Sequence, residues 1–200
     1  IPFYSKNVQN HTENCKMLSK IVKAGSITNL TDARFFSAFE VDFIGFCFDP
    51  QSALYISPQN ALAIKGWITG PKIVAEFANQ DPDNIKNIIQ FFEPDIIEID
   101  EQNLETILPL CISLNKQLIV RTVSEKETNE HILFYLAPLS AAEKIKDKSN
   151  FIFDLTESTT TAPDISNLPA IQLKGSPEQE VGIKSFDNIA HILESIEIAN

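Results

Sequence analysis

The residues of this chain with the chemistry to bind or transform a ligand are charged side chains at the ends of short apolar runs. They are Lys23, Asp49, Glu76, Glu98, Asp100, Arg121, Asp154 and Lys174. Carboxylates can transfer protons, and lysine or arginine can hold an anionic group. If the runs are parallel strands, their carboxyl ends meet at one face and the charges form one mouth. This mouth has three possible interpretations: a pocket for a polar ligand, a rim of ion pairs, or solvated charge without a role. The sequence does not decide among them, because alternation along a strand does not say which side chains point inward.

The best candidate for an anion site is the segment that follows the last apolar run. Lys174, Gly175 and Ser176 stand there in succession. A glycine allows backbone N–H groups to converge on an anion, and the lysine adds charge. A plain turn explains the same three residues. With Lys23 and Arg121, they make up the predicted ligand-binding set.

No residue can be assigned a catalytic role from sequence alone, and the candidates are Glu76, Asp100 and Asp154. Glu76 interrupts an otherwise apolar run, where an unpaired carboxylate is costly. It is therefore either half of an ion pair with Lys23 or Arg121, or a catalytic group with a raised pKa.

Neither a metal, a cofactor nor a disulfide framework is predicted. The chain has three cysteines and three histidines, all widely spaced: Cys15, Cys47, Cys111, His11, His131 and His191. No CxxC or His/Cys cluster is present. Free thiols are typical of a reducing cytoplasm, which is the expected location.

The charge balance limits the classes of partner. A net charge of -11 argues against binding nucleic acid or anionic membranes, because both need cationic surfaces. No apolar run is long enough to span a bilayer, and no positively charged, then apolar, leader is seen. The expected partner is a small anionic metabolite, and the expected state is a monomer or a homodimer.

The elements that must position these residues alternate between strand and helix. The apolar runs 19–24, 42–48, 72–78, 95–99 and 117–123 are nearly continuous, as in parallel strands covered on both faces. Helix starts are marked by Ser57-Pro58, Asp81-Pro82 and Ser185. This alternation predicts an α/β fold with a parallel sheet.

The number of strands depends on the stretch 124–170. Runs at 131–137, 150–155 and 170–174 give eight strands, with shortened or missing helices in the second half. The alternative makes 127–146 one helix and leaves seven strands. We favour eight, a single closed (β/α)8 TIM barrel over 17–200, because an open barrel exposes strand edges. Residues 1–16 are polar and aperiodic, and are expected to form a flexible extension.

Several motifs resemble those of the phosphoribosylanthranilate isomerase family. K-A-G-S-I-T at 23–28 and D-A-R at 32–34 correspond to the family's K-x-C-G-[IL]-T and the D-A that follows. G-F-C-F-D-P at 45–50 and S-A-L-Y-I-S-P at 52–58 correspond to its G-F-x-F-x-P-x-S-P-R-Y-I-S-P. E-F-A-N at 76–79 and V-G-I-K at 181–184 are similar to its V-F-x-N and P-G-x-K segments. The match is specific over 23–79 and moderate over 171–196.

The resemblance implies an Amadori isomerisation of a ribose ring in tryptophan biosynthesis, but this chain departs from the family at the residues that perform it. The family's base, a cysteine, is replaced by Gly25, and its substrate-holding arginine by Leu54. The family's acid, an aspartate, falls near Ala137 with eight strands; with seven, Asp154 takes its place. The Q-L-H-G end of the fourth strand becomes E-I-D-E at 98–101, and the Gly-Gly phosphate loop has no counterpart.

Three hypotheses remain open at this stage. The chain is a degenerate barrel that binds a sugar-phosphate-like or other anionic metabolite without the isomerisation. Otherwise it is an active isomerase using substitute carboxylates, or a non-catalytic structural or interaction protein with a plugged mouth.

Overall fold

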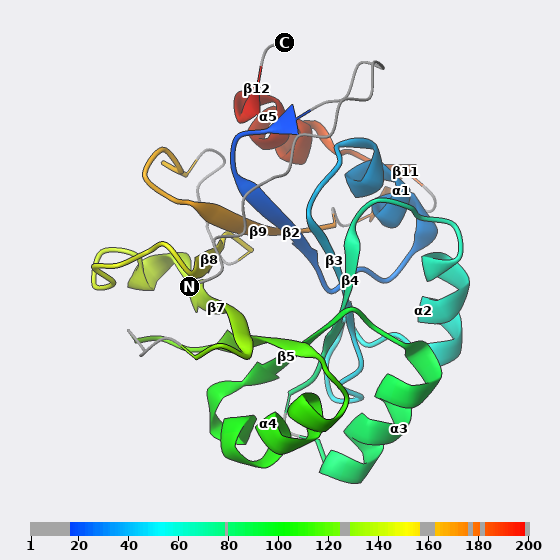
Figure 1. Ribbon diagram of the computed structural model, residues 1–200. Helices are drawn as coiled ribbons and strands as arrows, with labels where there is room; N and C mark the ends of the chain where they lie inside the picture. The colour runs from blue at the N-terminus through cyan, green and yellow to red at the C-terminus, as the bar shows by residue number, and fades with distance from the viewer. Residues whose placement is uncertain are drawn as a thin grey trace.

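The computed structural model describes residues 17–78, 80–124, 129–156, 163–175, 178–180 and 183–198, and within these ranges eight parallel strands close into one barrel (Figure 1). The predicted extension 1–16, Ser176 and the Val181-Gly182 pair lie outside the described residues. The barrel strands, in spatial order, are β2 (Ile21–Gly25), β3 (Phe43–Cys47), β4 (Lys72–Glu76), β5 (Ile96–Asp100), β6 (Gln117–Arg121), β7 (Ile132–Pro138), β8 (Phe151–Asp154) and β9 (Ala170–Lys174).

The eight-strand prediction is confirmed, and the seven-strand alternative is wrong. β7 occupies part of the stretch that the alternative made a helix, and it pairs in parallel with both β6 and β8. The barrel closes where Ile21 to Gly25 of β2 pair with Ala170 to Lys174 of β9. A closed sheet leaves no unpaired edge, which is the physical reason for the eighth strand.

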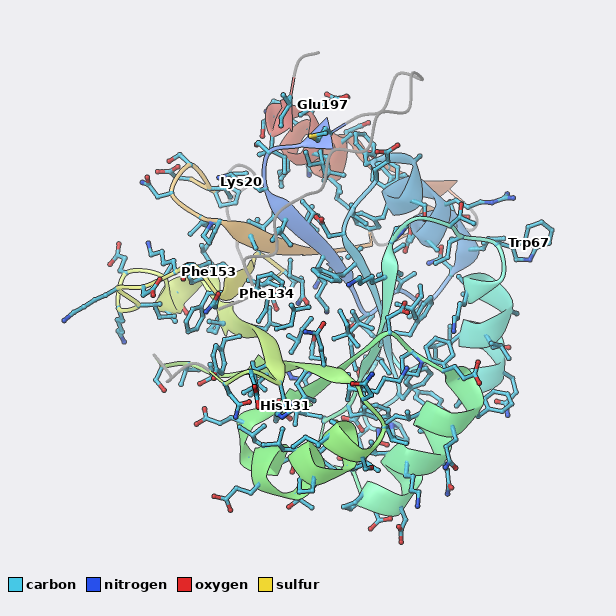
Figure 2. The ribbon with its side chains drawn as sticks, in the orientation of Figure 1. Lys20, Trp67, His131, Phe134, Phe153 and Glu197 are labelled. Atoms are coloured by element: carbon cyan, nitrogen blue, oxygen red, sulfur yellow. The ribbon has the colours of Figure 1, made fainter. Side chains whose placement is uncertain are left out.

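The interior of the barrel is apolar at one end and polar at the other. Phe43, Val74, Ile96, Ile119, Phe134, Leu136, Ile152 and Ala170 form one buried apolar cluster. Phe134 points into the space that the strands enclose (Figure 2). Two residues further along a strand the side chain returns to the same face. That step leads from Val74 to Glu76, from Ile96 to Glu98 and from Ala170 to Gln172, so these three polar side chains point inward.

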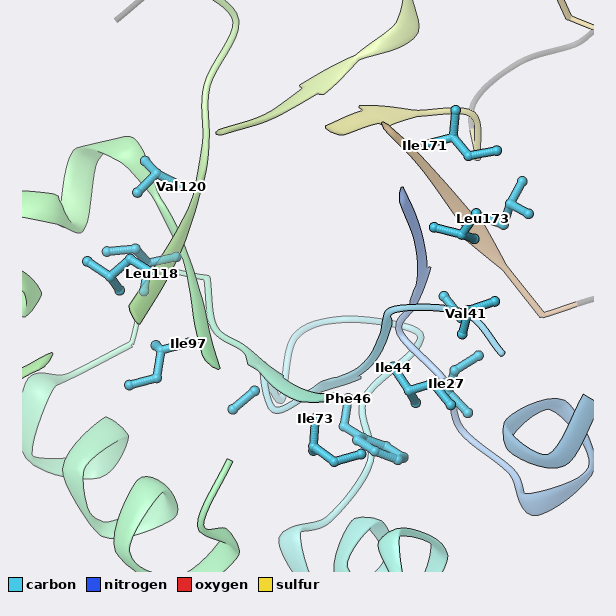
Figure 3. Close-up of a cluster of buried hydrophobic side chains, with 14 of the residues drawn as sticks. Ile27, Val41, Ile44, Phe46, Ile73, Ile97, Leu118, Val120, Ile171 and Leu173 are labelled. Carbon is cyan, nitrogen blue, oxygen red and sulfur yellow. The ribbon is translucent and has the colours of Figure 1, made fainter. Parts of the chain in front are cut away.

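The helices cover the outside of the first half of the barrel. They are α1 (Leu30–Ala38), α2 (Pro58–Lys65), α3 (Pro82–Phe92), α4 (Leu104–Ser113) and, near the end of the chain, α5 (Asp187–Ser195). A larger apolar cluster lies between the strands and these helices, and Figure 3 shows part of it, including Phe46, Ile73 and Ile97. In the described part of the second half, the connections after β6, β7 and β8 contain one short 3-10 turn, η2 (Leu139–Ala141). The expected loss of helices there is confirmed for these residues.

Local caps begin the helices where the sequence predicts them. The Oγ of Ser57 and a carboxylate oxygen of Asp81 accept from the N–H groups of Asn60 and Asn84. The last helix begins at Asp187, two residues after Ser185, whose Oγ accepts from the N–H of Asp187.

Two short antiparallel pairs complete the described structure. β1 (Met17–Leu18) pairs with β12 (Glu197–Ile198), and β10 (Glu178–Glu180) pairs with β11 (Ile183–Lys184). The first pair joins the two ends of the described chain. No helix in the described ranges is long and apolar enough to cross a lipid bilayer.

Replacing Phe43 by alanine tests the inner cluster. Phe43 is fully buried, and its ring packs edge-on against Phe134 with centroids 6.0 Å apart. We expect Phe43→Ala to lower the free energy of unfolding by about 3–5 kcal/mol, because it leaves a cavity between the strands. The matched control is Phe91→Ala on α3, where the ring is 48% exposed and the change should stay within about 0.5 kcal/mol. Urea unfolding measures both, and equal losses would contradict the assignment.

Candidate functional site

A cavity of about 170 Å³ lies at the carboxyl ends of the barrel strands. Every barrel strand except β3 contributes at least one residue to the wall of this cavity, and the other wall residues lie in the segments that follow strands. The lining residues are Gly25, Ser26, Leu54, Glu76, Glu98, Arg121, Leu136, Asp154, Thr156, Gln172 and Lys174. The predicted mouth therefore exists as a hollow, and most of the residues predicted for it are in its wall.

Lys23 lies beneath this wall and is the centre of a buried charge cluster. Its side chain is completely buried, and its Nζ lies 2.5 Å from Glu76 Oε1, 2.8 Å from Glu98 Oε2 and 2.6 Å from Gln172 Oε1. The ammonium group donates hydrogen bonds to Glu76 and Gln172 and forms an ion pair with Glu98, so its charge is balanced within the protein. The geometry does not support the predicted role of Lys23 as a ligand contact, because its buried ammonium group is already paired with two carboxylates of the protein.

The absence of a side chain at Gly45 makes room for this cluster. A Cβ at that position would lie 1.9 Å from Glu76 Oε1 and 3.2 Å from Lys23 Nζ. No side chain fits there while Glu76 and Lys23 remain paired. The glycine of the Gly-Phe-Cys-Phe motif is thus explained by close approach across β3 and β4.

Glu76 also ties down the loop after β2. Both the backbone N–H and the Oγ of Ser26 donate to its carboxylate, the Oγ at 2.7 Å. Ser26 has a φ of 50°, a left-handed conformation that is unusual without glycine. Burial alone would raise the pKa of Glu76, but Lys23 and Ser26 together hold that pKa below its usual range. Burial likewise lowers the pKa of Lys23, and the attraction of Glu76 and Glu98 outweighs it and raises that pKa. Of the two sequence alternatives for Glu76, the structure favours the ion pair.

A second cation, Arg121, extends the cluster toward the cavity. Its Nη1 lies 2.9 Å from Glu98 Oε1, its Nε lies 2.7 Å from Asp100 Oδ1, and its Nη2 donates to the carbonyl of Phe77. Burial and the nearby charge of Glu76 raise the pKa of Glu98, although Lys23 and Arg121 oppose them. Arg121 lines the cavity, but three of its donor groups are engaged within the protein.

Two charged groups of the wall have no ion pair among the described residues: Asp154 and Lys174. The Oδ1 of Asp154 accepts from the N–H of Thr156 at 2.9 Å, and the side chain of Lys174 is exposed. They end the neighbouring strands β8 and β9. A ligand in the cavity can therefore meet one carboxylate and one ammonium group that no described residue neutralises.

Gly175, the next member of the predicted anion loop, has a packing role. A Cβ there would lie 2.0 Å from Asp32 Oδ2, on the first turn of α1. The glycine allows the segment after β9 to approach that carboxylate. A negative charge beside Gly175 is unfavourable for a phosphate at this point.

The positions that depart from the family's motifs can now be placed. Gly25 and Leu54 are both in the cavity wall. Ala137 is not: it packs in the outer apolar cluster, and the residue of β7 that faces the cavity is Leu136. Asp49, predicted for the mouth, accepts from the N–H of Gln51 and is not among the lining residues.

Sequence reasoning missed three polar lining residues, Ser26, Thr156 and Gln172. Gln172 carried a usable signal, because it lies two residues before Lys174 and so on the same face of β9. Ser26 and Thr156 follow the ends of their strands, where alternation no longer applies.

No group of three His, Cys, Asp or Glu side chains among the described residues is arranged to hold a metal ion. His131 directly precedes β7, and His191 is on α5. Burial raises the pKa of Cys111 to about 12, so its thiol stays protonated at neutral pH.

Comparison with known proteins points consistently to the phosphoribosylanthranilate isomerase family. No family model matches the chain. N-(5'-phosphoribosyl)anthranilate isomerase from Thermotoga maritima is 31% identical over 103 residues, which cover 50% of this chain and 47% of that protein. The match therefore spans about half the length of the curated relative.

Solved structures extend the similarity to most of the chain. The phosphoribosylanthranilate isomerase of Thermus thermophilus superposes with a TM-score of 0.68 at 17% identity, covering 87% of this chain and 96% of that one. TrpF from Jonesia denitrificans superposes with a TM-score of 0.71 at 12% identity, covering 88% and 96%. At these identities the structures establish the shared TIM barrel, and the predicted resemblance to the family is confirmed.

Substituting Lys23 tests the buried charge cluster. We expect Lys23→Met to lower the free energy of unfolding at pH 7 by about 3–5 kcal/mol, because it leaves Glu76 and Glu98 buried without their shared cation. Lys86→Met on α3, where the lysine is exposed, is the matched control and should change stability by less than about 0.5 kcal/mol.

The deficit of Lys23→Met should shrink as the pH falls from 7 to 5. In the unsubstituted chain the pKa of Glu76 is lowered, so its contribution to stability is retained from pH 7 to pH 5 and is lost only at lower pH. In the variant, burial without Lys23 raises that pKa, so the penalty is largest at neutral pH and is relieved by protonation. Urea unfolding at both pH values measures the difference, and a deficit that does not change with pH would contradict an ionised pair.

Proposed function

We propose that this chain is a phosphoribosylanthranilate isomerase-like barrel that binds a small anionic, sugar-phosphate-like metabolite without the family's Amadori isomerisation. The observation that carries the proposal is the make-up of the cavity wall. Where the resemblance implies a base and a substrate-holding arginine, the wall has Gly25 and Leu54. Where it implies an acid, the end of β7 offers Leu136, Ala137 and Pro138. None of these side chains can transfer a proton or hold an anion.

The substitute carboxylates do not make up for this loss. The isomerisation needs one group to donate a proton and another to remove one. Glu76 is held by Lys23 and Ser26, and Asp100 by Arg121. The lowered pKa of Glu76 makes it a weak base, and Asp154 is the one carboxylate of the described wall without an ion pair. One free carboxylate does not form an acid and base pair.

The features that support binding remain. The cavity is open, which argues against a plugged, purely structural barrel. Lys174 provides an ammonium group at its wall, and Asp154 provides an acceptor for a hydroxyl group. Both suit a phosphorylated sugar.

An activity assay, rescue of an auxotroph and ligand-dependent thermal unfolding test the proposal. We expect no turnover of phosphoribosylanthranilate, and no rescue of a tryptophan auxotroph that lacks the isomerase. We expect ribose 5-phosphate to raise the melting temperature, since a ligand at about 100 times its Kd adds about 2.7 kcal/mol of stability. Anthranilate alone should give no shift. Measurable turnover would refute the non-catalytic assignment, and no shift with any ligand would favour a structural role.

Lys174→Ala tests the anion contact. A hydrogen bond to a charged group contributes about 1.5–3 kcal/mol, so the variant should bind ribose 5-phosphate roughly 10- to 100-fold more weakly. The matched control is Lys144→Ala, which removes an exposed ammonium group that does not line the cavity. Isothermal titration calorimetry gives both affinities, and equal binding by the two variants would remove Lys174 from the site.

A further inference from the structure

The side-chain amide of Gln172 is buried, oriented and left with unused donors at the cavity wall. Its exposed fraction is 7%, and its Oε1 accepts from Lys23 Nζ at 2.6 Å. An ammonium group only donates, so the oxygen of the amide must face Lys23 and the Nε2 must face away from it. This removes the usual ambiguity between the two ends of a glutamine amide.

The Nε2 group has no acceptor among the described residues, and Gln172 lines the cavity. Among the described residues, the buried side-chain polar atoms without a hydrogen-bond partner are Ser37 Oγ and Glu98 Oε2, and Gln172 Nε2 is not one of them. The Nε2 group lies at the wall of the hollow, where a ligand oxygen can reach it. The polar atoms of Lys23 and Glu76 are engaged with one another, with Ser26, with Glu98 and with the Oε1 of Gln172, so the Nε2 group is the part of this network that is left for a ligand.

Gly25 provides the space that the amide occupies. A Cβ on Gly25 would lie 2.9 Å from both the Cδ and the Oε1 of Gln172 and 3.3 Å from its Nε2, and these are the three nearest atoms. Any side chain at position 25 would therefore press on the amide and displace it. The glycine that replaces the family's cysteine and the glutamine of β9 form one unit.

The neighbours of Gln172 indicate what kind of molecule it recognises. Asp154 is its register partner on β8, and Lys174 lies two residues further along β9. An uncharged donor, an acceptor and a cation thus lie on adjacent strands. They match a molecule with a carbonyl or hydroxyl oxygen, a hydroxyl hydrogen and an anionic group. The cavity volume is close to that of an engineered cavity of about 150 Å³ that holds one benzene ring, so it suits a single small ring or short chain.

We propose that Gln172 is the specificity-determining residue of this cavity, and that its Nε2 donates to an uncharged hydroxyl or carbonyl oxygen of a small sugar phosphate. The inference rests on the proposed function and adds to it the contact that distinguishes a sugar from a bare anion. Lys174 recognises the charge, and Gln172 recognises the sugar.

Calorimetric titration of the full chain with ribose 5-phosphate and with inorganic phosphate separates the two contacts. Gln172→Ala should bind ribose 5-phosphate roughly 3- to 10-fold more weakly, and should bind inorganic phosphate as the unsubstituted chain does. Gln172→Met keeps about the size of the side chain without the donor and without adding a charge, and should behave in the same way. Gln90→Ala, on the exposed face of α3, is the matched control and should bind both ligands normally. Thermal unfolding establishes that each variant is folded.

A double-mutant cycle tests the pairing with Gly25. Gly25→Ala should weaken ribose 5-phosphate binding in the unsubstituted chain, because its Cβ displaces the amide, and should have no further effect in the Gln172→Ala background. Ribose 5-phosphate binding that is unaffected by both Gln172 variants would overturn this inference and leave the proposed function standing. A chain that binds ribose 5-phosphate no better than it binds inorganic phosphate would overturn both.

Discussion

The ammonium group of Lys23 lies inside the barrel at the level where the apolar interior ends and the cavity begins. It contacts the carboxylates of Glu76 and Glu98 and the amide oxygen of Gln172, so it joins β2, β4, β5 and β9. Two carboxylates buried this deeply would be strongly destabilising without a shared cation. Arg121 supplies a second cation to Glu98, and Glu76 in turn holds Ser26. The floor of the cavity is therefore one connected set of charges, and only the groups above it are available to a ligand.

Glycine residues provide the space that several polar side chains at this end of the barrel occupy. Gly45 gives Glu76 its place beside Lys23, Gly25 gives Gln172 its place above it, and Gly175 admits Asp32 next to the last strand. Each of these glycines is explained by a polar side chain from another element that lies where a Cβ would be. A glycine in a motif that resembles a catalytic family can thus be kept for a different physical reason.

Much of the fold and part of the site could be predicted from the sequence. Nearly continuous apolar runs separated by capped helices identify the parallel strands, and the need to close the sheet identifies β7 and β8 in a stretch with few helices. The charged residues near the ends of the apolar runs predicted a polar mouth at one face of the barrel. The sequence does not reveal which charges neutralise one another. Lys23 lies within β2 and Lys174 ends β9, but the first is buried against two carboxylates and the second is exposed at the wall. That distinction depends on distances across the barrel, which no periodicity contains.

The internal neutralisation also makes the proposed anionic ligand compatible with a chain whose net charge is -11. At physiological ionic strength the potential of exposed charges fades over about 8 Å, so the overall charge has little influence inside the cavity. The carboxylates nearest the ligand, Glu76 and Glu98, are paired with Lys23 and Arg121, which reduces their repulsion. The local balance is then set by Asp154 and Lys174 at the wall. A ligand that carries both an anionic group and hydroxyl groups satisfies this pair, whereas a bare anion satisfies only the lysine.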